Sequence, residues 1–153
     1  MNLQEELKAL KERIAELENQ AKEEREFPQE GDSFYSISET GNIEGGMIWG
    51  GYPVDMNRMA MGNIFKTKEQ ADFAVEKLKV EAELRKFSRP FEYGKFNYNL
   101  LFDIDGNNFR TDVTSYCPSQ GAIYFESVEK AQEAVSTVGE ERIKKYLFGV
   151  EDL

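Results

Sequence analysis

Two residue types that often carry catalysis or bind transition metals, His and Cys, are almost absent from this chain. The sequence has no His and one Cys, Cys117, so a His-based catalytic dyad and a His-based or Cys-rich metal site are excluded. Asp103 and Asp105 resemble the start of a calcium loop, but Thr114 stands at the twelfth position, where a bidentate Glu is required. A hairpin turn explains the pair Asp105-Gly106 better. We therefore expect no catalytic residues, no metal and no cofactor.

The strongest candidates for a binding role lie in residues 45–63. This segment contains five Gly, four of the five Met and the single Trp of the chain. Trp, Tyr and Arg often dominate the energy of protein interfaces, and Met repacks readily against different partners. The sequence predicts a flexible partner-binding segment whose contact residues are Trp49, Tyr52, Met56, Arg58 and Met59. The alternative is that the methionines fill gaps in the core and the glycines form bulges.

A second candidate is a local excess of basic residues within residues 77–95. This stretch has six bases against three acids, a local charge of +3, in a chain whose net charge is −10. Arg and Lys side chains there would suit a small anionic ligand such as a nucleotide. The predicted anion-binding residues are Arg85, Lys86, Arg89 and Lys95. The alternative is the solvated face of a helix.

The composition narrows the class of protein. A length of 153 residues predicts one domain with a short appendage. The negative net charge disfavours general binding to nucleic-acid phosphates. No apolar run approaches the roughly 20 residues of a membrane span, and the start of the chain lacks the apolar segment of a signal peptide. We expect a cytoplasmic protein that binds neither membranes nor nucleic acids in general.

Residues 1–26 show the heptad spacing of a coiled-coil helix, and residues 27–32 form a linker after it. The apolar positions alternate at spacings of four and three: Leu3, Leu7, Leu10, Ile14, Leu17 and Ala21. In a parallel pair Glu6 would face Lys11 of the neighbour, and Arg13 would face Glu18. The predicted oligomerisation residues are Leu3, Leu7, Leu10, Arg13, Ile14, Leu17 and Glu18. A dimer is favoured over a trimer, and the alternative is a helix packed on its own domain.

Residues 33–153 predict an α+β domain with two similar halves, 33–87 and 95–138. Each half reads as a strand hairpin, a short third strand and a helix, and the first helix is expected at 68–87. The segment GAIYFESVEKAQEAV repeats GNIFKTKEQADFAV with one residue inserted. This pattern predicts an antiparallel sheet covered on one face by two equivalent helices, followed by a last helix near 140–148. The alternative is chance similarity between two helix starts.

The heptad arm, the segment GNIFKTKEQADFAVEKLKVEAELRKF and the closing IYFESVEKAQEAVSTVGEERIKKYLFGVE resemble a widespread group of small phage and prophage proteins. The similarity covers nearly the whole chain and brings no catalytic residues with it. It implies a viral accessory role inside a bacterial host cell. By analogy with anti-CRISPR proteins, it implies an oligomeric inhibitor that binds a host nuclease or effector of a defence system. The alternatives are sequestration of a signalling nucleotide and a structural role in the virion or its assembly.

Overall fold

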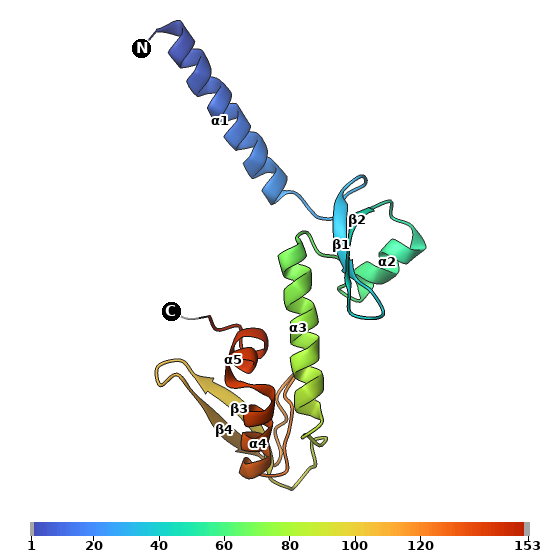
Figure 1. The fold of residues 1–153 in the computed structure, drawn as a ribbon, viewed down its shortest axis with the longest axis vertical. Helices are drawn as coiled ribbons and strands as arrows, with labels where there is room; N and C mark the ends of the chain where they lie inside the picture. Colours follow the sequence, from blue (N-terminus) through green and yellow to red (C-terminus); the bar gives the residue numbers. More distant parts are fainter. Residues whose placement is uncertain (1, 152–153) are drawn as a thin grey trace. The chain divides into compact units, whose positions relative to one another are not determined.

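The computed structural model of the chain has an α+β fold and describes residues 2–151 (Figure 1). Residues 1, 152 and 153, which belong to the predicted segments 1–26 and 33–153, lie outside the described residues. The chain divides into two compact units, Met1–Lys68 and Glu69–Leu153. The boundary at Lys68 falls inside the segment 33–153 that the sequence assigns to one globular domain.

The first unit begins with a long helix, α1 (Leu3–Glu24). Asn2 caps it: the Asn2 side chain accepts a hydrogen bond from the Glu5 amide at 2.9 Å, and the Glu5 carboxylate accepts one from the Asn2 amide at 3.0 Å. This reciprocal pair satisfies two backbone donors that a helix start leaves without partners. No residue of α1 is buried in the described chain, so the fold of the first unit leaves all faces of this helix open.

The rest of the first unit is a hairpin followed by a short helix. Strands β1 (Ser33–Ile37) and β2 (Ile43–Ile48) pair antiparallel, and helix α2 (Pro53–Ala60) follows. Phe34 of β1 packs edge-on against Trp49 with ring centroids 6.4 Å apart, and both side chains are buried. This pair forms the small apolar centre of the unit.

The second unit holds the main hydrophobic core. Its elements are α3 (Lys68–Arg85), β3 (Asn97–Asp103), β4 (Asn108–Thr114), α4 (Val128–Val138), α5 (Glu140–Arg142) and a π-helical turn, η1 (Ile143–Leu147). The C-terminal half of α3 and one face of α4 pack together with Phe125. The buried residues of this core are Val80, Leu84, Phe125, Ala131, Ala134, Val135, Val138 and Ile143. Ser127 caps α4 by accepting a hydrogen bond from the Lys130 amide at 3.1 Å.

The β3–β4 hairpin pairs without a bulge, with Leu100 opposite Thr111. In the turn, the Asp103 carboxylate accepts a hydrogen bond from the Gly106 amide at 3.1 Å. The residue with left-handed backbone is Asn107, with φ 49°, rather than Gly106. The hairpin that the sequence predicts is therefore confirmed, with the Asp103 side chain and the Asn107 backbone forming its turn.

The prediction of one continuous antiparallel sheet is wrong. The described residues form two separate two-stranded sheets, β1–β2 and β3–β4. The expected third strand of each half is reduced to isolated bridges: Tyr35 with Phe65 in the first half, and Arg89 with Tyr124 and Tyr98 with Phe125 in the second. The next helix begins within three residues of Phe65 and of Phe125, so neither segment continues as a strand beyond its bridge.

An ion pair joins α3 to α5 and predicts a small acid sensitivity of the second unit. The Arg142 guanidinium donates to both carboxylate oxygens of Glu83, at 2.7 and 3.0 Å. These hydrogen bonds lower the pKa of Glu83 below its ordinary 4.5. Because the unfolded chain has the higher pKa, the stabilisation is complete above that value and is lost as the pH falls through the folded-state pKa.

We expect Glu83→Gln to lower the free energy of unfolding by about 0.5–1 kcal/mol at neutral pH, a small loss because both side chains are partly exposed. The difference in unfolding free energy between the variant and the unmodified chain should shrink as the pH falls below the pKa of Glu83 in the unfolded chain. Urea unfolding of both proteins across that range measures it. A deficit that stays constant with pH would show that ionisation of Glu83 contributes nothing.

Candidate functional site

The apolar residues of the predicted coiled coil form one exposed line along α1. This α1 seam consists of Leu3, Leu7, Leu10, Ile14 and Leu17, whose exposed fractions range from 46% to 83%. The structure therefore does not pack these residues on their own domain. Arg13, predicted to pair between chains, lies 2.8 Å from Glu16 of the same helix, and both side chains are more than half exposed. Such an exposed pair is weak and competes little with a pairing across two helices.

The residues predicted to bind a partner lie from the end of β2 to the end of α2: Trp49 follows β2, Tyr52 precedes α2, and Met56, Arg58 and Met59 lie within α2. Tyr52 is 68% exposed, and Met56 and Met59 are each about half exposed. Ile48, Val54 and Met61 are also exposed nearby in the sequence. We call Tyr52, Met56 and Met59 the α2 surface. The sequence assigned these positions to a flexible segment, and that interpretation is wrong, because residues 53–60 form a helix.

Asp55 fixes the start of α2 and with it the position of Tyr52. The Asp55 carboxylate is buried and accepts hydrogen bonds from the amides of Gly50, at 3.1 Å, and Tyr52, at 3.3 Å. A Cβ atom on Gly50 would meet the Tyr52 ring at 2.4 Å, so only glycine lets the ring lie there. The exposed Tyr and Met side chains are thus carried by a short rigid element.

Two of the predicted contact residues have structural partners instead of free surfaces. Trp49 is 8% exposed and packs on Phe34, so it belongs to the core of the first unit and not to an exposed contact surface. Arg58 lies with its guanidinium 3.5 Å from the buried Asp55 carboxylate. Of the predicted contact residues, Tyr52, Met56 and Met59 are therefore exposed, while Trp49 and Arg58 contact other residues of the first unit.

The sequence contains a signal for α2 that the pattern of glycines and methionines hides. Pro53 occupies the first helical position, where its missing amide has no cost. Asp55 stands two residues later, where an acid accepts hydrogen bonds from a helix start. A Pro and an Asp at these positions predict a helix even within a Gly-rich segment, and they would have identified Asp55 as the residue that orients the surface.

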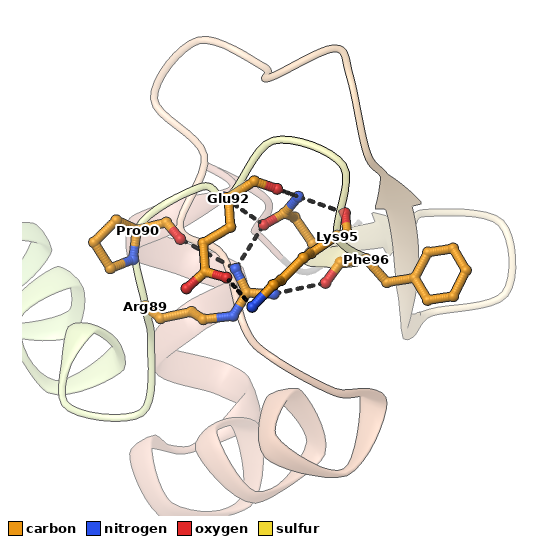
Figure 2. Close-up of polar contacts among 6 residues, drawn as sticks. Arg89, Pro90, Glu92, Lys95 and Phe96 are labelled. Carbon is orange, nitrogen blue, oxygen red and sulfur yellow. Dashed lines mark hydrogen bonds and ion pairs between the residues drawn. The ribbon is translucent and has the colours of Figure 1, made fainter.

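The predicted anion-binding residues do not converge on one opening. Figure 2 shows the Arg89 guanidinium turned into its own loop. It donates to the Asn97 side-chain oxygen at 2.7 Å, to the Phe96 carbonyl at 2.7 Å and to the Pro90 carbonyl at 3.1 Å. Since three acceptors of the chain surround it, Arg89 serves as a clamp for the loop before β3.

Two further members of that set are paired with carboxylates of the same chain. Lys95 lies 3.0 Å from Glu92, and its hydrogen bond lowers the pKa of Glu92 below the ordinary value. Arg85 lies 3.3 Å from Glu81 on the exposed side of α3. Lys86 is exposed just after the end of α3. These residues therefore resemble the solvated face of a helix more than a binding site for an anion.

Asn97 is the centre of this loop and was not singled out by sequence reasoning. It is completely buried. Its side-chain oxygen also accepts a hydrogen bond from the Glu92 amide at 2.9 Å. Its side-chain nitrogen donates to the carbonyls of Glu92, Lys95 and Thr114 at 2.9, 2.9 and 3.0 Å. We call Asn97 with Arg89 and these backbone groups the Asn97 cluster.

Three further features bear on the class of protein: groups of metal ligands, membrane-spanning helices and similarity to known proteins. Within residues 2–151 no three His, Cys, Asp or Glu side chains are grouped to hold a metal ion. None of the described helices combines the length and the apolar character needed to cross a bilayer. Comparisons with protein-family models, with curated proteins and with solved structures find no match.

Proposed function

We propose that this chain is a non-catalytic binding protein that assembles through the α1 seam and holds a protein partner on the α2 surface. The observation that carries this proposal is the exposure of Tyr52, Met56 and Met59 beside the buried capping carboxylate of Asp55. Large apolar side chains held on a rigid element lose little conformational entropy when they bind. Tyr is also enriched among the residues that dominate interface energy.

The charge around the α2 surface indicates the chemistry of the partner. Residues 32–65 contain four acids and one base, a charge of −3. The base, Arg58, already faces the carboxylate of Asp55. The partner that fits is a protein with an apolar pocket surrounded by basic residues, because opposite potentials steer association and exclude acidic competitors.

A second copy of the chain is the proposed occupant of the α1 seam. The heptad places Glu6 against Lys11 of the neighbour and Arg13 against Glu18, so both charge pairs of a parallel dimer attract. Two copies would present two α2 surfaces, and a bivalent partner would then be bound more tightly than by a single chain.

We also propose that the two halves of the chain derive from one repeated plan. Each half has a hairpin, a bridge to its first strand and a helix, in that order. Equivalent positions support the proposal by sharing a positive φ or the same burial: Gly62 with Gly121, Ala71 with Ala131, and Val75 with Val135. Helix α2 interrupts the first half alone, so the α2 surface is an addition to the repeated plan.

The resemblance to phage proteins makes a nuclease or effector of a bacterial defence system the first class of partner to test. Tagged protein is used to capture its partner from a bacterial host lysate. We expect Tyr52→Ala combined with Met56→Ala to reduce capture of that partner about tenfold or more, because each removes a large contact side chain. Capture should also weaken as salt is added, since the partner is basic.

The matched control is Tyr93→Ala, which removes a tyrosine from the second unit that is also exposed, at 80%. This variant should capture the partner as the unmodified chain does. Equal capture by the Tyr52/Met56 variant would place the contact elsewhere. Turnover of any substrate by the purified protein would contradict a non-catalytic role.

A further inference from the structure

Strand β4 has an unpaired outer edge. Among the described residues β4 pairs with β3 alone, and the isolated bridges involve other strands. The hairpin is drawn in yellow and brown in Figure 1. An edge of seven residues presents backbone donors and acceptors that can pair with another strand.

The pairing of β3 shows which backbone groups of β4 point outward. Tyr98 exchanges two hydrogen bonds with Phe125, at 3.1 and 2.7 Å, on the side of β3 away from β4. The N–H and C=O groups of successive residues point to opposite sides of a strand. Those of residues 97 and 99, on either side of Tyr98, therefore point towards β4. In the observed register those positions oppose Thr114 and Asp112. The outward-facing backbone groups of β4 are therefore those of Phe109, Thr111 and Val113.

The side chains of β4 are complementary to a second, antiparallel copy of the same strand. If Thr111 lies opposite Thr111 of the copy, Arg110 of each chain lies opposite Asp112 of the other. The Arg110 and Asp112 side chains are exposed on one face of the hairpin. Opposite charges directly across two strands attract, and the two-fold symmetry provides the contact twice.

The other face of the strand fits the same register. Phe109 of one copy lies opposite Val113 of the other, an aromatic and β-branched pair that favours strand pairing. Val113 is 46% exposed. A groove of about 550 Å³ lies next to the first half of the strand, bordered by Phe109 and Thr111 of β4 and by Gln132 and Ser136 of α4. It leaves room for apolar side chains from an added strand.

We infer that β4 is a self-association edge, which pairs antiparallel with β4 of a second copy about a two-fold axis at Thr111. The neighbouring symmetric registers are disfavoured, because a centre at Arg110 places Arg against Arg and a centre at Asp112 places Asp against Asp. The centre at Thr111 also uses all seven residues of the strand. This contact is separate from the α1 seam and does not depend on the proposed function.

A charge-exchange series tests the contact in the full chain carrying Leu10→Asp and Ile14→Asp, which removes association through α1. We expect this chain to dimerise reversibly at high concentration in sedimentation equilibrium. Arg110→Asp alone and Asp112→Arg alone should each raise the dissociation constant about ten- to thirtyfold, because attraction becomes repulsion at two places. The double exchange should restore dimerisation.

Hydrogen exchange tests the register in the same chain. The amides of Phe109, Thr111 and Val113 should exchange more slowly as concentration rises, while those of Arg110 and Asp112 should not change. Thr111→Pro should abolish the dimer without removing a bond to β3, because the Thr111 amide points outward. Thr111→Val, which keeps the amide, is the control.

Three results would overturn the inference: a single-chain mass at every concentration, failure of the double exchange to restore association, or equal protection of all β4 amides. Different results would contradict the proposed function. These are equal masses for the unmodified chain and the Leu10/Ile14 variant, or undiminished capture by the Tyr52/Met56 variant.

Discussion

Replacement of Asn97 by Asp is expected to lower the free energy of unfolding by about 3–5 kcal/mol, the cost of leaving a buried charge without sufficient partners. The change keeps the shape of the side chain and exchanges its NH2 group for an oxygen. The nitrogen now donates to the carbonyls of Glu92, Lys95 and Thr114. A carboxylate would place negative charge against all three of them. Arg89 faces only the other oxygen, so it offsets part of the cost.

The matched control is Asn99→Asp, two residues further along the same strand, where the side chain is only partly buried. It should cost less than about 1 kcal/mol, as most substitutions outside a buried network do. Urea unfolding of the three proteins measures the difference. Equal losses for the two variants would mean that the Asn97 cluster contributes no more than an ordinary strand position.

The second large effect is expected from the α1 seam. Leu10→Asp combined with Ile14→Asp should raise the dissociation constant of the coiled coil more than about a thousandfold, since each large apolar side chain buried contributes about 1.5–3 kcal/mol. The folded units should keep their stability, because no residue of α1 is buried within the chain. Light scattering at low micromolar concentration measures the change as a fall to the single-chain mass.

Ala9→Asp combined with Ala15→Asp is the control, since it adds the same charge to exposed positions of α1 outside the seam. That protein should keep the mass of the unmodified chain. A mass of two chains would support the dimer, and a mass of three chains would replace it by a trimer with the same seam. A single-chain mass for the unmodified protein at high concentration would contradict the coiled coil.

The helices and hairpins of this chain follow from local patterns. The helix expected at 68–87 is observed as Lys68–Arg85, and Pro90 prevents its extension. The turn at Gly41 has the positive φ, 83°, that a glycine allows. These features depend on residues close together in the sequence, so periodicity and turn chemistry are enough to predict them.

The candidate sites are harder to predict from the sequence, because their geometry depends on contacts between distant residues and on the direction in which each side chain points. Trp49 has the composition of a contact residue, yet Phe34, fifteen positions earlier, buries it. Arg89 has the charge of an anion ligand, yet the carbonyls of its own loop surround it. Hydropathy and charge counts do not distinguish these outcomes. Tyr52, Met56 and Met59 are exposed, as a contact role requires, and that role stays a prediction.

The exposed methionines in and just after α2 also affect how the purified protein ages. Met56, Met59 and Met61 are open to solvent. Peroxides convert an accessible thioether to a sulfoxide, which is polar and chiral. In a sample aged in air these side chains would therefore become polar, while the circular dichroism of the protein stayed the same. A reductase specific for methionine sulfoxide would restore the apolar side chains.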